Sequence, residues 1–124
     1  MVLNLVLSVL LVFAGVSVGG KIDPNLVRYG SISSFDESKG DRIGTIKSQK
    51  LYLALPEYQT IKSEKVKPGT ARYTQLMRGA TMRYRKILSS VSKSQNFVII
   101  VEEGGVHGYK TTDITTMCIE RVKP

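Results

Sequence analysis

Residues 70–101 carry the pattern that most constrains the fold, because they join a long amphipathic helix directly to a buried strand. Apolar side chains recur at alternating steps of four and three, which places them on one stripe of a single helix. The stripe consists of Tyr73, Met77, Ala80, Tyr84, Ile87 and Val91. At Gln95-Asn96 the period changes, and FVIIV at 97–101 is an unbroken β-favouring run. The sequence therefore predicts a helix over 70–94 and a strand over 97–101, each of which needs a partner.

A second strand and a second helix are predicted upstream of this stretch. RIGTIK at 42–47 is a strand candidate, and Ser48 stands where a helix N-cap belongs. A helix follows over 49–66, and Pro56 breaks or restarts it about two turns in. We expect the strand at 97–101 to pair beside this first strand.

A very short turn connects the two predicted helices. Lys67, Pro68 and Gly69 have the residue types of a turn, and Thr70 is placed to cap the second helix. So short a connection predicts that the helices lie antiparallel, as a hairpin over about 49–94. The predicted fold is α+β: a small strand body with a projecting antiparallel helical hairpin.

The end of the chain is predicted to return to the body. Glu102-Glu103-Gly104-Gly105 is a turn, and residues 106–109 are expected to form a short returning strand. Asp113 and the threonines before it offer an N-cap for a last helix over 114–122. The predicted order is thus strand, helix, helix, strand, strand, helix.

Residues 1–20 contain no charged side chain and end in small residues, which is typical of an export signal. No Lys or Arg precedes the apolar run, so a retained membrane anchor is the alternative. Residues 21–41 are rich in turn formers and are predicted as a linker, with a short strand near 26–32. A single domain over 42–124 follows.

Cationic residues are concentrated within 61–93. This stretch has a single acid, Glu64, and accounts for the whole formal net charge of +8. Its cations are Lys62, Lys65, Lys67, Arg72, Arg78, Arg83, Arg85, Lys86 and Lys93. Such a concentration attracts nucleic acid, acidic lipid headgroups or anionic polypeptide, whereas the alternative is a helix face kept soluble by its charge. With an export signal, we expect polypeptide or lipid rather than nucleic acid.

Five residues of the long helix are predicted to bind an anionic or unfolded partner. They are Arg78, Met82, Arg83, Arg85 and Lys86. Met82 lies off the apolar stripe and is therefore expected to be exposed, where its flexible thioether suits varied apolar contacts. By contrast, Tyr73, Met77 and Tyr84 lie on the stripe and are expected to pack against the first helix.

No residue pattern predicts catalysis, a metal or a cofactor. Cys118 lies on the apolar face of the last helix without a base at i±3 or i±4, and His107 lies in a glycine-rich turn. A single cysteine excludes an internal disulfide and a multi-cysteine metal site. Gly104, Gly105 and Gly108 lack the Lys-Ser/Thr ending of a phosphate loop. We therefore expect a non-enzymatic protein.

Two separated stretches resemble the OmpH/Skp family of periplasmic chaperones. RIGTIKSQKLYLALPEYQ resembles the start of the mature family chain, with a strand, a Ser-Gln link and a helix that passes through Pro-Glu. ILSSVSKSQNFVIIVEEGGVHGYKTTDIT resembles its end, where a helix leads into a strand, a turn and a helix opened by Asp-Ile-Thr.

The resemblance implies a trimer in which strands of three subunits form a body and helical hairpins project as arms. Family members hold unfolded outer-membrane proteins between these arms, without a cofactor or catalysis. The resemblance therefore implies an exported periplasmic or cell-envelope protein that binds unfolded or anionic polypeptide. A basic module that binds membrane lipid or lipopolysaccharide is the alternative. This chain departs from the family in its arm, which the turn at 67–69 makes much shorter.

Overall fold

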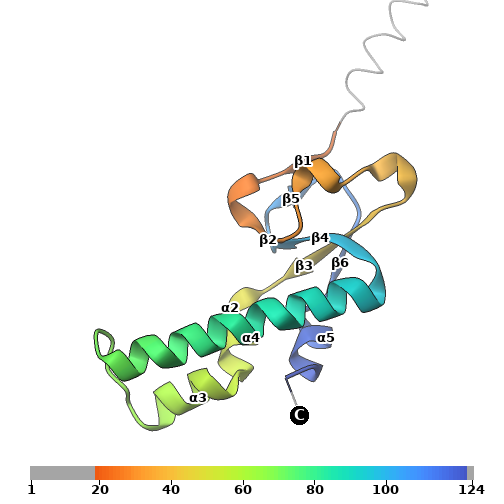
Figure 1. Ribbon diagram of the computed structural model, residues 1–124. Helices are drawn as coiled ribbons and strands as arrows, with labels where there is room; N and C mark the ends of the chain where they lie inside the picture. The colour runs from red at the N-terminus through yellow and green to blue at the C-terminus, as the bar shows by residue number, and fades with distance from the viewer. Residues whose placement is uncertain (1–18, 123–124) are drawn as a thin grey trace, which may run out of the picture.

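The computed structural model describes residues 19–122, so the predicted export signal at 1–20 lies almost entirely outside the described residues. The described chain is α+β, as predicted. Its strands gather at one end of the molecule, and its helices lie at the other end (Figure 1). None of the helices within residues 19–122 is both long and apolar enough to cross a membrane.

A four-stranded sheet has at its centre the two strands that the sequence predicts. β3 (Arg42–Ile46) and β4 (Phe97–Glu102) are parallel neighbours, with Ile43 opposite Ile99. β2 (Val27–Tyr29) pairs antiparallel with β4, and β6 (Thr111–Asp113) pairs parallel with β3. The strand order is β2-β4-β3-β6, which confirms that residues 97–101 lie beside residues 42–47.

The predicted returning strand does not form a hairpin with β4, the strand that precedes it. β5 (Val106–His107) pairs antiparallel with β1 (Lys21–Ile22) in a separate two-stranded sheet. Gly108 and Gly20 allow this close approach. A Cβ atom at Gly108 would lie 2.1 Å from the carbonyl oxygen of Gly19, and one at Gly20 would overlap the ring of Tyr109.

Residues 21–41 are packed against the sheet and are not a linker. Besides β1 and β2 they contain three short 3₁₀ turns: η1 (Pro24–Leu26), η2 (Ile32–Ser34) and η3 (Glu37–Lys39). Half-buried apolar side chains of this stretch cover the cluster formed by Ile43, Ile99 and Val101; they are Ile22, Leu26, Val27 and Phe35. Turn formers dominate the composition here, but four well-spaced apolar residues suffice to attach the stretch.

The long helix is α4 (Ala71–Gln95), and Thr70 caps its start as predicted. Thr70 Oγ1 accepts a hydrogen bond from the backbone N–H of Tyr73 at 3.2 Å. Asn96 ends the helix in the left-handed conformation, with φ of 61°, and its N–H donates to the carbonyl of Ser92. The chain then enters β4 directly.

The first predicted helix is divided in two at Pro56. α2 (Ser48–Ala54) ends at Leu55, which is extended, and α3 (Pro56–Ser63) starts in a new direction. Ser48 is not the N-cap of α2. Lys47 occupies that position, and the Ser48 hydroxyl bonds Glu102 and Tyr84 instead.

The last helix is shorter than predicted at both ends, with Ile114 as its N-cap and Arg121 as its C-cap. α5 spans Thr115–Glu120, and Asp113 belongs to β6. Asp113, predicted as an N-cap, lies one residue before the actual N-cap, Ile114, but its Oδ1 still accepts from the N–H of Thr115 in the first turn at 2.9 Å.

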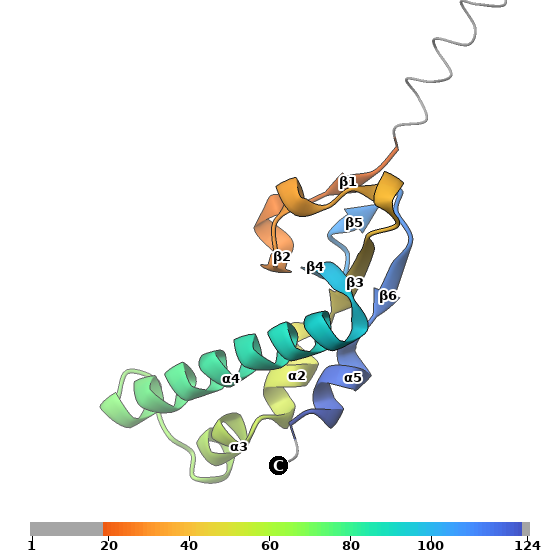
Figure 2. The same cartoon turned by 45° about the vertical axis from the view of Figure 1, so that its right-hand side comes forward.

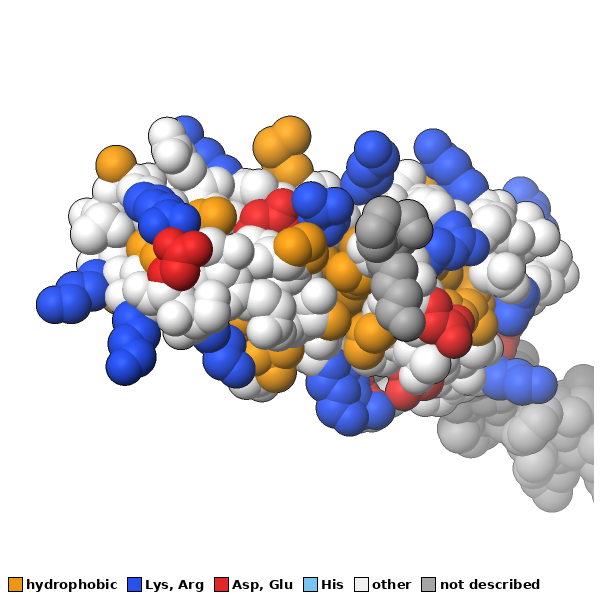
Figure 3. All heavy atoms as spheres, turned by 90° about the horizontal axis from the view of Figure 1, so that it is seen from below, with side chains coloured by type: hydrophobic (Ala, Val, Ile, Leu, Met, Phe, Trp, Pro, Cys, Tyr) orange, Lys and Arg blue, Asp and Glu red, His pale blue; other side chains and the backbone are white. Residues whose placement is uncertain are grey.

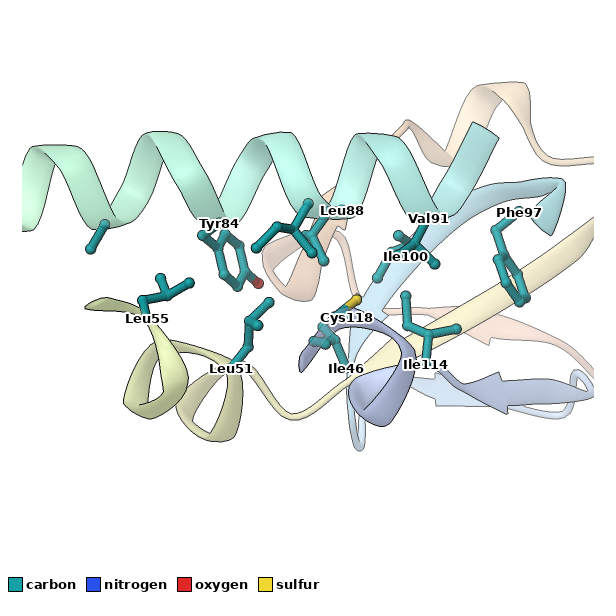
Figure 4. Close-up of a cluster of buried hydrophobic side chains, with 12 residues drawn as sticks. Ile46, Leu51, Leu55, Tyr84, Leu88, Val91, Phe97, Ile100, Ile114 and Cys118 are labelled. Atoms are coloured by element: carbon teal, nitrogen blue, oxygen red, sulfur yellow. The ribbon is translucent and has the colours of Figure 1, made fainter. Parts of the chain in front are cut away.

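The main core lies between α4, the two helices α2 and α5, and the adjoining face of the sheet (Figure 4). Leu51, Leu88, Ile100 and Ile114 are essentially inaccessible to solvent there. Beyond this core, α4 continues away from the sheet together with α3, and the turn that joins these two helices is the end farthest from the strands (Figures 1 and 2).

Candidate functional site

The surface of α4 carries a shallow groove that is lined by residues of this helix alone, with a volume of about 520 Å³. Its walls are two neighbouring rows of side chains with four-residue spacing, the i±4 ridges of a helix surface. One row contains Tyr73, Met77, Thr81 and Arg85, and the other contains Thr74, Arg78 and Met82. Lys86 extends the second row by one further step. We call this surface the α4 groove.

The α4 groove is open because of the bend at Pro56. α2 covers α4 at Tyr84, whose ring stacks on Tyr52 with 4.7 Å between the ring centroids. After the bend, α3 packs on another side of α4, where Glu57 meets Gly79 and Arg83.

The bend leaves the start of the apolar stripe outside the core. Ala80, Tyr84, Ile87 and Val91 are buried, as a structural stripe requires. Tyr73 and Met77 are only half-buried and line the groove. The prediction had these two residues pack against the first helix, and in the structure part of each side chain is also accessible from the groove.

Met82 is the most exposed large apolar residue of the described chain, with 71% of its surface accessible. Its exposure was predicted from its place off the stripe. Together with Tyr73 and Met77 it gives the groove an apolar surface on a helix whose other exposed positions are mostly polar or cationic. This combination of apolar and cationic side chains makes the groove the candidate contact surface.

The cations beside the groove are of two kinds. Arg78, Arg85 and Lys86 are exposed and have no ion pair within residues 19–122. Arg83, which was also predicted to bind a partner, is engaged within the chain. Its Nε and Nη2 donate to both carboxylate oxygens of Glu57 at 2.9–3.1 Å.

The Arg83–Glu57 pair corrects the predicted set of binding residues. The hydrogen bonds from Arg83 lower the pKa of the Glu57 carboxyl and raise that of the guanidinium. This bidentate pair holds α3 against α4, so Arg83 has a structural role.

A view from below shows Lys and Arg side chains spread over the helical layer, with far fewer acids among them (Figure 3).

The residues that sequence reasoning considered for nucleophilic chemistry are not arranged for it. Cys118 is fully buried beside Ile46 and Leu88 (Figure 4). Burial raises the pKa of its thiol to about 11, which disfavours the reactive thiolate. His107 is exposed on β5, at the far side of the sheet. Within residues 19–122 there is no group of three His, Cys, Asp or Glu side chains that could hold a metal.

The two adjacent carboxylates, Glu102 and Glu103, form separate structural contacts. Glu102 accepts from Arg28 Nε at 3.1 Å and from the backbone N–H of Ser48 at 3.0 Å. Glu103 pairs with Lys47 at 3.2 Å. Neither carboxylate faces the other across a cavity, so they do not form an acid–base pair.

A scan against protein-family models and searches of curated proteins and of solved structures returned no match for this chain. The site is therefore described by its own geometry.

The sequence correctly predicted exposed cations at Arg78 and Arg85, which line the α4 groove, and at Lys86, which extends it. It also correctly predicted that Met82 is exposed. It missed the participation of Tyr73, Thr74, Met77 and Thr81. Their four-residue spacing was visible in the sequence, but the stripe of alternating fours and threes assigned two of them to the core. Whether these two residues lie in the core or line the groove depends on the change of direction of the chain at Pro56.

Proposed function

We propose that this protein is a non-enzymatic, exported chaperone-like protein that binds unfolded or anionic polypeptide at the α4 groove. The observation that carries the proposal is the exposed Met82 between Arg78 and Arg85, in an open groove lined by residues of α4 alone. Cations attract an anionic chain over a distance, and flexible apolar side chains hold varied segments of it on contact. No nucleotide or metal is needed for this activity.

The order of elements supports the OmpH/Skp-like part of the proposal. Strand β3, helices α2 and α3, helix α4, strands β4 and β5, and helix α5 come in the order that the resemblance implies, with the short strand β6 inserted before α5. We propose that α3 and α4 act as a short antiparallel arm on the strand body. We further propose that three copies join through their strand bodies, with the free edges at β2 and β6 available for contact. The periplasm or cell envelope is the proposed location.

The alternative function is a basic module that binds membrane or envelope surfaces. Arg78, Arg85 and Lys86 also suit the phosphates of anionic lipid or lipopolysaccharide. The apolar part of the groove favours polypeptide, because cations alone would satisfy phosphate groups. Sedimentation of the protein with anionic vesicles but no effect on an unfolded protein would favour the alternative.

The proposal is tested by dilution of a urea-unfolded outer-membrane β-barrel protein into buffer, with aggregation followed by light scattering. We expect the protein to suppress aggregation at near-stoichiometric concentrations. A variant with Arg78→Gln, Met82→Gln and Arg85→Gln should lose most of this protection. All three positions are exposed or line the groove, so the variant should keep its fold, which far-UV circular dichroism checks.

The matched control removes two exposed helical cations outside the groove, through Lys50→Gln and Lys62→Gln. It should protect as well as the unchanged protein. Equal protection by the groove variant would contradict the assignment of the site. Analytical ultracentrifugation tests the assembly separately: a monomer at micromolar concentration would exclude the trimer, whereas the groove proposal would stand.

A further inference from the structure

We propose that the α4 groove selects a particular kind of polypeptide segment: an acidic amphipathic helix, whose apolar ridge enters the groove between two carboxylates. The inference rests on the proposed function and deepens it, since it specifies which segments of a client or partner are bound. It follows from the shape of the groove, from its charges and from what covers the rest of α4.

The shape of the groove favours a helix as its occupant. The space between two i±4 ridges of a helix is the place that a side-chain ridge of a second helix fills when helices pack. The lining of the groove consists of exactly two such ridges, one from Tyr73 to Arg85 and one from Thr74 to Met82. From residue 73 to residue 86 the surface is about 20 Å long, enough for about four turns of a partner helix.

The position of the groove favours the same occupant. α2 covers α4 at Tyr84 through the stacked ring of Tyr52, and the Tyr52 hydroxyl lies 3.2 Å from the hydroxyl of Thr81. Met77 and Tyr73 continue this line along α4 after α2 has ended. A bound helix would thus occupy the place where the first helix would have continued if Pro56 had not redirected it.

The charges decide which helix fits. Arg78 and Arg85 lie in the two walls of the groove, and Lys86 extends it; none of them has an ion pair within residues 19–122. A second copy of this groove would place like charges against one another, which opposes pairing of two α4 helices. A helix with carboxylates satisfies the cations, and an apolar side chain between the carboxylates contacts Met82.

The spacing of the cations sets the pattern of the partner. Residues 78 and 85 are seven apart, which is about 10.5 Å along the helix axis. A partner helix presents carboxylates at this separation when they are at positions i and i+7, with apolar residues at i+3 and i+4 on the same face. In an extended segment, carboxylates on one face are about 6.6 or 13 Å apart, which matches this spacing less well than a helix does.

The test uses three fluorescein-labelled 18-residue peptides of identical composition except where stated. The first places Glu at i and i+7 with Leu at i+3 and i+4, on an Ala-rich helical background. The second has the same residues in an order that distributes Glu and Leu around the helix. The third is the first peptide with one central Ala→Pro change that breaks the helix. Binding to the full protein is measured by fluorescence anisotropy at low salt.

We expect the first peptide to bind at least tenfold more tightly than the other two. The double substitution Arg78→Gln and Arg85→Gln should weaken binding of the first peptide by about tenfold, through the loss of two partly exposed ion pairs. The control double substitution Lys50→Gln and Lys62→Gln should weaken binding of this peptide less than twofold. Equal binding of all three peptides would overturn the inference, while aggregation suppression by the groove would still support the proposed function. The inference would also be overturned if the protein bound none of the peptides but sedimented with phosphatidylglycerol vesicles. That result would favour the lipid-binding alternative.

Discussion

The thiol of Cys118 is buried at the junction of α5 with α4 and the sheet, with none of its surface exposed. Desolvation raises its pKa to about 11, so almost no thiolate forms at neutral pH in the folded protein. Burial therefore protects this residue from modification in two ways, by preventing access and by disfavouring the thiolate.

This burial predicts that Cys118 reports global unfolding. With the thiol reagent DTNB at pH 8, the folded protein should react at least a hundredfold more slowly than the urea-unfolded protein. The dependence of the labelling rate on urea should follow the loss of helical circular dichroism. Fast labelling of the folded protein would show that α5 detaches locally from the core.

Asp113 stabilises the protein through contacts that require its charged form. Hydrogen bonds from Thr115, together with Lys47, hold the pKa of its carboxyl at about 2, below its ordinary value of 3.8. Because the folded pKa is the lower one, this stabilisation is present above about pH 4. It is lost as the pH falls through about 2.

We therefore expect Asp113→Asn to lower the free energy of unfolding at pH 7. The side chain is nearly half exposed, so the decrease should be about 1 kcal/mol. The difference between the variant and the unchanged protein should shrink as the pH falls from 4 to 2. Urea denaturation at several pH values measures it, and a constant difference over this range would contradict the role of the charge.

At the scale of elements, α3 packs along α4, and the Arg83–Glu57 pair adds a bidentate ion pair to this packing. Arg83 is partly exposed, so solvent screens part of the attraction. A double-mutant cycle with Arg83→Gln and Glu57→Gln should give a coupling energy of about 0.5–1 kcal/mol. It should decrease as salt rises to 1 M. A coupling energy near zero would mean that apolar packing of Ile61 alone holds α3 in place.

A second joint connects α2 to the end of β4 through Glu102. Its carboxylate accepts from Ser48 and from Arg28, and the same Ser48 hydroxyl lies 2.5 Å from the hydroxyl of Tyr84. Burial raises the pKa of that tyrosine, which keeps it a neutral hydrogen-bonding partner. Four elements of the fold thus meet at one partly buried network.

Loss of the Glu102 charge should therefore be costly. Glu102→Gln replaces one acceptor by a donor that faces Arg28 or Ser48, and we expect a loss of about 1–3 kcal/mol in the free energy of unfolding. Glu103→Gln is the matched control at the neighbouring, more exposed position, and it should cost about 0.5 kcal/mol or less. Equal effects in thermal denaturation would contradict the importance of the network.

The elements that the sequence predicted correctly are those with many consistent local signals. α4 has a long period and a capping threonine, and β4 has six residues with an apolar majority. The missed elements, β1 and β6, contain two and three residues, too few to show a period, and β2, with three residues, was predicted only as a short strand near 26–32. β2 and β6 become strands by pairing with β4 and β3, and β1 becomes one by pairing with β5.

The candidate site was also predicted only in part, because a sequence pattern reports local features and not contacts between distant residues. Exposure of Met82 and of the cations follows from their position around one helix, which is local information. The engagement of Arg83 depends on Glu57, which is 26 residues away in the sequence. The place of Tyr73 and Met77 depends on the direction that the chain takes after Leu55, and no local pattern specifies it.

At the scale of the whole molecule, two clusters of apolar side chains share the central sheet. One lies on its helical face, and the other lies beneath residues 21–41, where Phe35 meets Tyr109 with their ring centroids 5.1 Å apart. Because β3 and β4 contribute to both clusters, we expect the two layers to unfold together. A true linker at 21–41 would have no effect on the helices.

The last prediction tests this coupling with Phe35→Ala, which removes a half-buried ring far from any helix. We expect a loss of about 1–2 kcal/mol in the free energy of unfolding, less than for a fully buried phenylalanine. The readout is circular dichroism at 222 nm, which reports the helices, so a change there shows that the two layers are linked. Ile32→Ala in the same stretch is the control; its side chain is 39% exposed, and it should cost 0.5 kcal/mol or less. An unchanged helical transition in Phe35→Ala would mean that residues 21–41 fold independently of the body that supports α4.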